Sequence, residues 1–202
     1  MKARIAVFVS GGGTNLQALI DCQAAGKIPS GEIALVFSNK ENVFALQRAE
    51  RAGIPTRVLT RKAIPNTHER IEALHAMLKE FKIDMIVLAG FLGIIHRETV
   101  ELYENRIINI HPSLVPAFSG MGFFGIHVHE AALKRGVKIS GATVHLVTEE
   151  IDAGPILMQK AVEVLPGDTP EALQLRIMEQ AEWVILPQAT EMIAKKVLNE
   201  RK

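Results

Sequence analysis

The sequence has little cysteine and almost no net charge. A single cysteine, Cys22, occurs among 202 residues, which excludes an intramolecular disulfide framework and a cysteine-rich zinc site. Lysine and arginine number 23 against 22 aspartate and glutamate residues, so no overall field directs the chain toward nucleic acid or an anionic membrane. We therefore expect a cytoplasmic protein with a small ligand held by local contacts, and neither a nucleic-acid nor a membrane partner.

Long apolar runs, repeats and linkers are absent as well. No apolar stretch is long enough to span a bilayer, and the start MKARIAVFVSGGG reaches its glycines too early for a signal peptide. With 48% hydrophobic residues, the chain is long enough to bury one substantial core. We expect a single domain over residues 1–202.

Short β-branched runs alternate with longer amphipathic stretches, a pattern typical of βαβ units. It predicts strands at 4–10, 32–39, 56–59, 84–90, 106–110, 141–147 and 155–164. It predicts helices at 14–27, 43–53, 67–82, 127–136 and 170–198, the last interrupted near Pro187. The expected fold class is α/β: a Rossmann-like open sheet, mostly parallel with one outer antiparallel strand, and helices on both faces. Ligands of such sheets bind beyond the carboxyl ends of the strands.

The stretch SGGGTNLQAL places three glycines between the first strand and the first helix. Backbone N–H groups and a helix amino terminus can converge on an anion there. Leu16 stands where a dinucleotide fingerprint has its third glycine, and no lysine follows in the Walker spacing, so a monophosphate fits better. The alternative is a tight turn capped by Thr14 and Asn15 for helix geometry alone.

The stretch IINIHPSLVPAF ends a predicted strand with two hydrogen-bonding side chains. Asn109 and His111 are two residues apart, so they lie on the same side of the strand and present an amide and an imidazole at one place. The alternative is that both only satisfy loop carbonyls. Prolines follow, and Pro116 is a candidate for a cis peptide bond.

The stretch VTEEIDAGPIL follows another predicted strand and is rich in acidic side chains. Asp152, next to Ala-Gly-Pro, is the best candidate to reach His111 across the strand ends, whereas Glu149 and Glu150 fit solvated loop charge. A carboxylate beside an imidazole favours the protonated ring. We therefore expect Asp152 to hold His111 protonated near neutral pH.

Three other histidines have simpler interpretations. His127 and His129 form a His-x-His pattern, but they open a predicted helix and no third ligand stands at a telling spacing, so we expect no metal site. His145 lies in a predicted strand and is interpreted as a satisfied core or sheet-face residue.

Six stretches together resemble the phosphoribosylglycinamide formyltransferases, folate-dependent enzymes of purine synthesis. These stretches are SGGGTNLQALI, VFSNK, LAGF, NIHPSLVPAF, GATVHLVTEEIDAGPIL and EWVILP, and the resemblance runs from about residue 4 to 198. HPSLVP alone is shared with other formyl-folate enzymes. The resemblance implies that a formyl group passes from 10-formyltetrahydrofolate, as co-substrate, to the amine of glycinamide ribonucleotide, without a metal.

The resemblance also implies which residues form the site. The catalytic residues would be Asn109, His111 and Asp152, with the first two stabilising a tetrahedral oxyanion. The ribonucleotide-binding residues would be Gly12, Gly13, Thr14 and Asn15 at the phosphate and Glu182 at the ribose. The folate-binding residues would be Leu92, Gly93, Ile94, Ile95, Asn109, Thr148, Glu149, Glu150, Ile151 and Asp152.

Some features depart from the family's pattern. Gly93 and Thr67 stand where many relatives carry arginine, which bears on contacts to the folate tail. The segment 119–126 is longer than in those relatives and has two possible roles, a mobile flap beside the site or a dimer contact. We expect a monomer or a homodimer.

Two other functions remain open on the sequence. A related enzyme could hydrolyse formyl-folate or formylate an initiator tRNA, but such relatives carry an additional domain that this sequence is not expected to have. A non-catalytic nucleotide-binding module would need the glycine loop but not the convergence of Asn109, His111 and Asp152.

Overall fold

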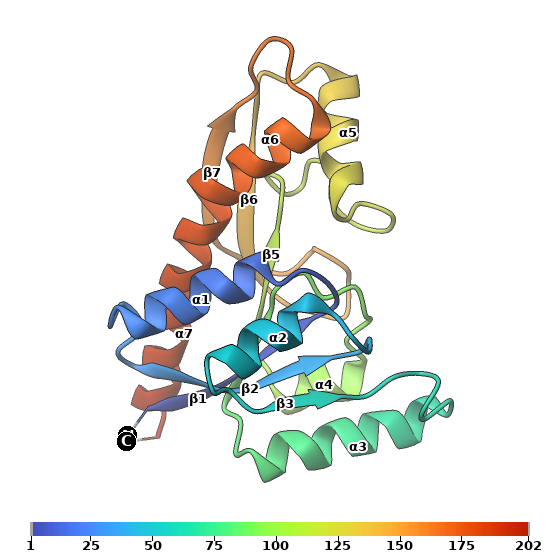
Figure 1. Cartoon of the computed structure of the whole chain (residues 1–202), viewed down its shortest axis with the longest axis vertical. Coiled ribbons are helices and arrows are strands. Elements are labelled where there is room, and N and C mark those ends of the chain that lie inside the picture. Colours follow the sequence, from blue (N-terminus) through green and yellow to red (C-terminus); the bar gives the residue numbers. More distant parts are fainter. Residues whose placement is uncertain (1, 202) are drawn as a thin grey trace.

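A seven-stranded sheet forms the centre of the structure, a computed structural model that describes residues 2–201 (Figure 1). Its strands lie in the order β3-β2-β1-β4-β5-β6-β7. The bounds are β1 Ala3–Val9, β2 Gly31–Ser38, β3 Thr56–Val58, β4 Met85–Leu88, β5 Ile107–His111, β6 Ile139–Leu146 and β7 Ile156–Glu163.

Five of these strands, β1 to β5, are parallel. β6 runs antiparallel to both β5 and β7, so it is the strand that opposes all the others. β7 is the edge strand, one place further out. The predicted class, a mostly parallel open α/β sheet with helices on both faces, is confirmed.

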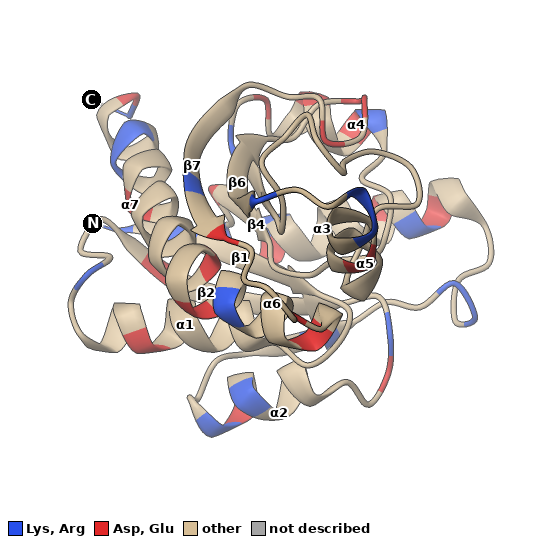
Figure 2. Ribbon diagram, turned by 90° about the horizontal axis from the view of Figure 1, so that it is seen from above, with Lys and Arg blue, Asp and Glu red and all other residues tan. Residues whose placement is uncertain are grey.

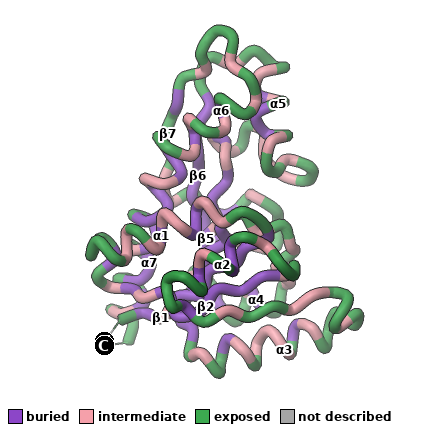
Figure 3. Tube along the Cα trace, viewed as in Figure 1, coloured by how far each residue is buried: buried purple, intermediate pink, exposed green. Residues whose placement is uncertain are grey.

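Helices cover the two faces of the sheet unequally. α1 (Thr14–Ala24), α2 (Phe44–Arg51), α5 (Ile126–Arg135), α6 (Pro170–Ile177) and α7 (Trp183–Asn199) pack on one face, whereas α3 (Thr67–Glu80) and α4 (Arg97–Leu102) pack on the other. The tube in Figure 3 shows buried residues along the strands and exposed residues along the outer sides of the helices. The sheet is thus the layer between two apolar cores.

The sequence of β1 explains how one strand serves both cores. Ile5 and Val7 belong to the core under α1 and α7, and the alternating residues Ala6 and Phe8 belong to the core under α3 and α4. All four are fully buried. A strand covered on both faces needs a continuous apolar run rather than an alternating one, which ARIAVFV provides.

Local departures from the predicted elements have physical reasons. The carboxyl-terminal helix is interrupted at a π-helical turn, η1 (Met178–Glu182), whereas Pro187 lies inside α7. The ring of a proline collides with the carbonyl four residues earlier, which for Pro187 is that of Trp183. The π-helical turn η1 ends directly before Trp183, so the irregular turn lies where the proline disturbs the helix. The short helix α4 was not predicted, because RETVEL has no helical repeat of apolar residues. The peptide bond before Pro116 is cis, as anticipated.

Acidic and basic residues are interspersed along the helices (Figure 2). None of the helices within residues 2–201 is both long enough and apolar enough to cross a membrane.

Candidate active site

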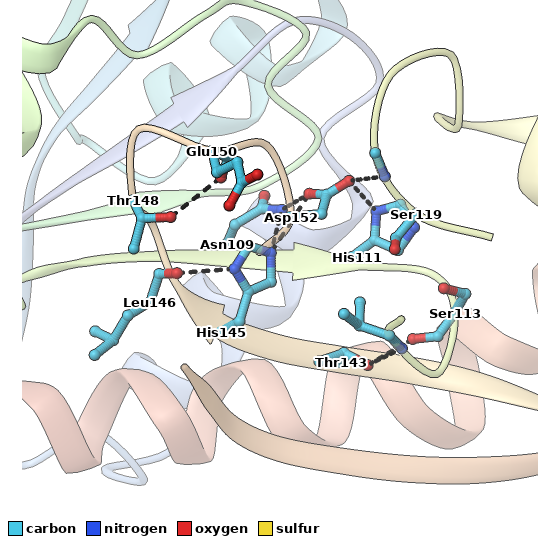
Figure 4. A network of polar contacts seen from close by, with 12 residues as sticks. Asn109, His111, Ser113, Ser119, Thr143, His145, Leu146, Thr148, Glu150 and Asp152 are labelled. Atoms are coloured by element: carbon cyan, nitrogen blue, oxygen red, sulfur yellow. Dashed lines mark hydrogen bonds and ion pairs between the residues drawn. The ribbon is translucent and has the colours of Figure 1, made fainter. Parts of the chain in front are cut away.

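β5 brings Asn109 and His111 to the edge of the sheet where β4 ends. In the register of the two strands, Leu88 at the end of β4 pairs with Asn109, so β5 continues beyond its neighbour. Asp152 comes from the loop after β6 and lies between the two side chains (Figure 4). The structure thus brings the three predicted catalytic residues together.

The carboxylate of Asp152 is shared between two groups of partners. One oxygen, Oδ1, lies 3.4 Å from Nδ2 of Asn109 and 3.5 Å from Nε2 of His145. The other, Oδ2, accepts the backbone N–H of Gly120 at 2.9 Å and lies 3.5 Å from Nδ1 of His111. Burial acts to raise the pKa of Asp152, but His145, the Gly120 N–H and His111 together hold the pKa below its ordinary value. The carboxylate is therefore charged at neutral pH.

The loop that carries Asp152 is pressed against β6. A Cβ atom on Gly154 would lie 1.8 Å from the carbonyl oxygen of Leu146, so only glycine fits there. Asp152 itself has a φ of +54°, in the left-handed region that aspartate tolerates better than most residues. This close approach fixes the position of the carboxylate relative to β5 and β6.

Burial opposes the charge state predicted for His111. It lowers the pKa of His111 below its ordinary value, and the Phe118 carbonyl and the Asp152 carboxylate offset this only in part. This direction runs against the expectation that Asp152 holds the ring protonated near neutral pH. Nε2 lies 2.8 Å from the Phe118 carbonyl and donates to it, and Nδ1 faces Asp152.

His145 is buried and satisfied by hydrogen bonds, which agrees with its interpretation as a satisfied core or sheet-face residue, and it also belongs to the same network. Nδ1 of His145 donates to the Leu146 carbonyl at 2.9 Å, and Nε2 accepts from the Asn109 amide at 3.1 Å. This contact orients the amide of Asn109. The two residues are a cross-strand pair of β5 and β6, a relationship that only the strand register discloses.

The glycine loop leads into α1, and two of its glycines have open space around them. A Cβ on Gly11 or Gly12 would meet no atom within 4 Å. Gly13 has a φ of +73°, and its Cβ would lie 2.6 Å from the Cβ of Ala45, so this glycine is needed for the fold. No side chain caps the amino terminus of α1, which differs from the turn capped by Thr14 and Asn15 that was the alternative interpretation.

Glu182 lies beside this helix amino terminus, as the resemblance implied. It is 6% exposed, and Nδ2 of Asn15 donates to its Oε2 at 2.5 Å. Burial raises the pKa of Glu182 to about 7, and the Asn15 donor offsets part of that rise. Oδ1 of Asn15 is buried without a hydrogen-bond partner, and the hydroxyl of Thr14 lies 3.6 Å from Sδ of Met178.

Apart from Asn109 in β5, the predicted folate residues occupy two loops with exposed apolar side chains. Leu92 and Ile94 are 53% and 71% exposed on the loop after β4, and Ile151 is 45% exposed on the loop after β6. An ion pair of 3.3 Å between Arg97 and Glu149 joins the two regions. Glu150 is exposed as well, and its carbonyl accepts the hydroxyl of Thr148.

The two positions that depart from the family's pattern differ in their surroundings. A Cβ on Gly93 would lie 2.6 Å from two ring atoms of Phe91, so Phe91 occupies the space into which a longer side chain would extend. Ile95, two residues on, packs against the core under α3 and α4. Thr67 is the exposed first residue of α3, and its hydroxyl accepts from Arg70 at 3.2 Å.

The His-x-His pattern separates into one exposed and one buried ring. His127 pairs with Glu130 at 2.9 Å on the surface of α5. His129 is fully buried with both ring nitrogens unpartnered, and burial lowers its pKa to about 4, with His111 adding to the effect. In the part of the chain that the structure describes, no three His, Cys, Asp or Glu side chains are grouped to hold a metal ion.

A cavity of about 680 Å³ lies away from these residues, at the amino ends of β1, β4 and β5. Its lining includes Lys79, Arg106 and Arg201, which lie at or just beyond the carboxyl ends of α3, α4 and α7. Cations at these positions offset the negative ends of helix dipoles. We therefore assign the cavity no part in the site.

The sequence is similar to known proteins along most of its length. The family described as formyl transferase matches residues 3–190. The chain is 46% identical over 193 residues to the human trifunctional purine biosynthetic protein adenosine-3, covering 96% of this chain but only 18% of that protein. It is 40% identical to phosphoribosylglycinamide formyltransferase of Haemophilus influenzae, covering 91% of this chain and 84% of that one.

Solved structures match nearly the whole of this chain as well. Phosphoribosylglycinamide formyltransferase from Brucella melitensis matches with a TM-score of 0.87 and 43% identity, covering 96% of both chains. A formyltetrahydrofolate deformylase from Pseudomonas syringae matches with a TM-score of 0.83 and 26% identity, covering 98% of this chain and 62% of that one.

Proposed function

Because this chain belongs to the formyl transferase family, we propose that it transfers the formyl group of 10-formyltetrahydrofolate to the amine of glycinamide ribonucleotide. The observation that carries the proposal is the contact of Asp152 with both Asn109 and His111 at the edge of the sheet where substrates of such folds bind. One domain, residues 1–202, carries both substrates in this proposal.

The ribonucleotide binds at the start of α1. Its phosphate accepts backbone N–H groups of Gly12, Gly13, Thr14 and Asn15, which the positive end of the helix dipole favours. Glu182, held by Asn15, accepts from the ribose hydroxyls. The lack of a side-chain cap on α1 supports this assignment, because the first N–H groups of the helix need an acceptor.

The folate binds across the two exposed apolar loops. Leu92, Ile94 and Ile151 supply apolar contacts to its flat ring, and backbone groups of both loops fix its orientation. The whole predicted set, Leu92 to Ile95, Asn109 and Thr148 to Asp152, surrounds this position. The Phe91 ring takes the place in which the family's arginine would start, so the tail of the folate relies on other contacts here.

Transfer needs no covalent enzyme intermediate. The amine nitrogen attacks the formyl carbon, the carbonyl electron pair moves onto the oxygen, and the resulting oxyanion accepts an N–H from Asn109 and another from His111. Collapse then breaks the bond between the formyl carbon and N10 of the folate. The proton lost by the amine reaches N10 through a water ordered by the charged Asp152.

The contacts of His111 define what substrate binding changes. Its Nε2–H is donated to the Phe118 carbonyl, so donation to the oxyanion requires that this bond be exchanged. Phe118 itself has a φ of +51°, in the left-handed region that is unfavourable for phenylalanine.

The competing function is hydrolysis of formyl-folate, which the similarity to the Pseudomonas syringae deformylase favours. Both reactions need an oxyanion site and a charged carboxylate, so the presence of Asn109, His111 and Asp152 does not distinguish them. They differ in the acceptor, an amine or water. Binding groups for a ribonucleotide at Gly12–Asn15 and Glu182 favour the amine.

The test is to incubate the purified chain with 10-formyltetrahydrofolate, with and without glycinamide ribonucleotide, and to follow the folate product by absorbance. We expect turnover only with the ribonucleotide, together with a formylated ribonucleotide in the mass spectrum. Folate turnover without the ribonucleotide would support the hydrolase instead. His111→Ala should lose activity in the same assay, and His68→Ala, which removes an exposed histidine on α3, should not.

A further inference from the structure

Ser10 links the two regions that bind the two substrates. It is the residue after β1, it directly precedes the glycine loop, and it is 5% exposed. Its hydroxyl accepts the backbone N–H of Leu92 at 2.8 Å and donates to Oδ1 of Asn39 at 2.7 Å. Asn39 follows β2, and Leu92 lies on the loop after β4, so one hydroxyl connects the ends of three adjacent strands.

The hydrogen bond between Ser10 and Leu92 restricts the loop after β4. Nδ2 of Asn39 would lie 3.0 Å from a Cβ on Gly93, so the amide that accepts from Ser10 also packs against the next residue of this loop. Phe91 and Ile95 pack against the core under α3 and α4, whereas the side chains of Leu92 and Ile94 between them are exposed. The bond to Ser10 therefore fixes the backbone of Leu92, whose own side chain does not hold it in place.

We propose that Ser10 is a positioning residue that sets the folate loop relative to the ribonucleotide loop. This inference rests on the proposed function, because it assigns one substrate to each loop. The hydroxyl contacts neither substrate. It fixes the distance between the formyl carbon and the attacking amine, a geometry on which the rate of a two-substrate reaction depends steeply.

Ser10→Ala removes the hydroxyl and leaves the Leu92 N–H and Oδ1 of Asn39 without their partner. We expect the KM for 10-formyltetrahydrofolate to rise by roughly tenfold and kcat to fall by a similar factor, because both the loop and the reacting distance are less well fixed. The Kd of glycinamide ribonucleotide, measured by calorimetry, should stay within about twofold.

Ser38→Ala is a matched control. Ser38 ends the neighbouring strand β2, is fully buried, and likewise donates one hydrogen bond and accepts one. Both of its bonds, at 2.8 and 3.0 Å, return to Lys40 in its own turn. The two variants thus lose the same chemistry at the same edge of the sheet, but only Ser10→Ala releases the folate loop.

Asn39→Ala provides a second and milder variant, because Asn39 is only partly buried. It removes the acceptor of the Ser10 hydroxyl and leaves that hydroxyl able to accept from Leu92. The KM for the folate should rise by less than in Ser10→Ala, and the double variant should be no worse than Ser10→Ala alone. If Ser10→Ala does not fold, an unchanged folate KM in Asn39→Ala overturns the proposal.

The experiment combines steady-state kinetics with hydrogen exchange of the Leu92 amide by NMR in the wild-type chain and the four variants. Faster exchange of Leu92 and a raised folate KM in Ser10→Ala, with neither change in Ser38→Ala, support the proposal. Equal effects of the two variants overturn the role of Ser10 while leaving the proposed function intact. Absence of formyl transfer by the wild-type chain overturns the proposed function itself, and the substrate assignment of Ser10 with it.

Discussion

The side-chain amide of Asn15 donates to the carboxyl group of Glu182 at 2.5 Å, although 167 positions of the sequence separate the two residues. The bond joins the amino terminus of α1 to the π-helical turn η1. Because burial raises the pKa of Glu182 to about 7, this carboxyl group changes its charge near neutral pH.

Glu182→Gln should therefore change the pH dependence of stability. A carboxyl group whose pKa is raised on folding stabilises the fold fully below its unfolded pKa, and this stability is lost as the pH rises through about 7. Glutamine stays neutral and still accepts from Asn15. The free energy of unfolding, from urea denaturation, should match that of the wild type near pH 4 and exceed it by on the order of 3 kcal/mol above about pH 8.

Glu179→Gln is the control, since Glu179 lies exposed in the same turn. A gain in Glu182→Gln that does not vary with pH would contradict the explanation. The stabilised variant should bind the ribonucleotide more weakly, because a neutral amide accepts hydroxyl groups less strongly than a carboxylate.

His129→Leu should act in the opposite pH range. Because burial lowers the pKa of His129 to about 4, its contribution to stability is present above pH 6.5 and is lost as the pH falls toward 4. Leucine removes the titration and two unpartnered ring nitrogens. The variant should gain about 2 to 3 kcal/mol over the wild type near pH 4.5 and less near pH 8, as measured by urea denaturation.

The exposed neighbour His127 supplies the comparison. His127→Gln should leave the acid sensitivity of the buried His129 in place, because it replaces only an exposed ring on the surface of α5. If both variants flatten the profile equally, the acid sensitivity does not come from the buried ring.

Gly12→Ala and Gly13→Ala should separate binding from folding. The positive φ of Gly13 and the close approach of Ala45 make Gly13→Ala destabilising, by at least about 2 kcal/mol. A Cβ at Gly12 meets open space, so Gly12→Ala should leave the thermal stability unchanged. Its methyl group would hinder the phosphate from approaching the backbone N–H groups, so the affinity for the ribonucleotide should fall roughly tenfold. Unchanged affinity in Gly12→Ala would place the phosphate elsewhere.

Asp152→Asn should lower both turnover and the pKa of His111. The carboxylate raises that pKa against the effect of burial, so its removal lets the pKa fall further. Turnover should fall by about a hundredfold or more, since the charge that orders the proton-carrying water is gone. NMR titration of the His111 ring and steady-state assays test the two effects. A near wild-type rate, or a ring pKa that does not fall, would leave Asp152 only the role of a loop anchor.

Much of the fold followed from local patterns in the sequence. The run of apolar residues in β1 predicted a strand buried on both faces, and the two-residue spacing of Asn109 and His111 placed them on one side of β5. The same patterns predicted the edge of the sheet at which Asp152 meets them, because carboxyl ends of parallel strands gather there.

What the sequence did not disclose depends on register and burial. His145 meets Asn109 only because β6 pairs with β5 in one particular register, which residues 36 positions apart do not reveal. The charge state of His111 depends on how deeply the ring is buried, and the need for glycine at position 13 depends on the approach of α2. These are properties of packing between distant segments.

The bond between Asn15 and Glu182 also sets an order of events during synthesis. The two residues leave the ribosome 167 positions apart, which at roughly 5 to 20 residues per second is a delay of roughly 8 to 30 s. Residues of both folate loops, including Asp152, emerge within that interval. A nascent chain therefore carries both loops proposed to bind the folate before it has the carboxyl group of Glu182, which completes the proposed ribonucleotide site.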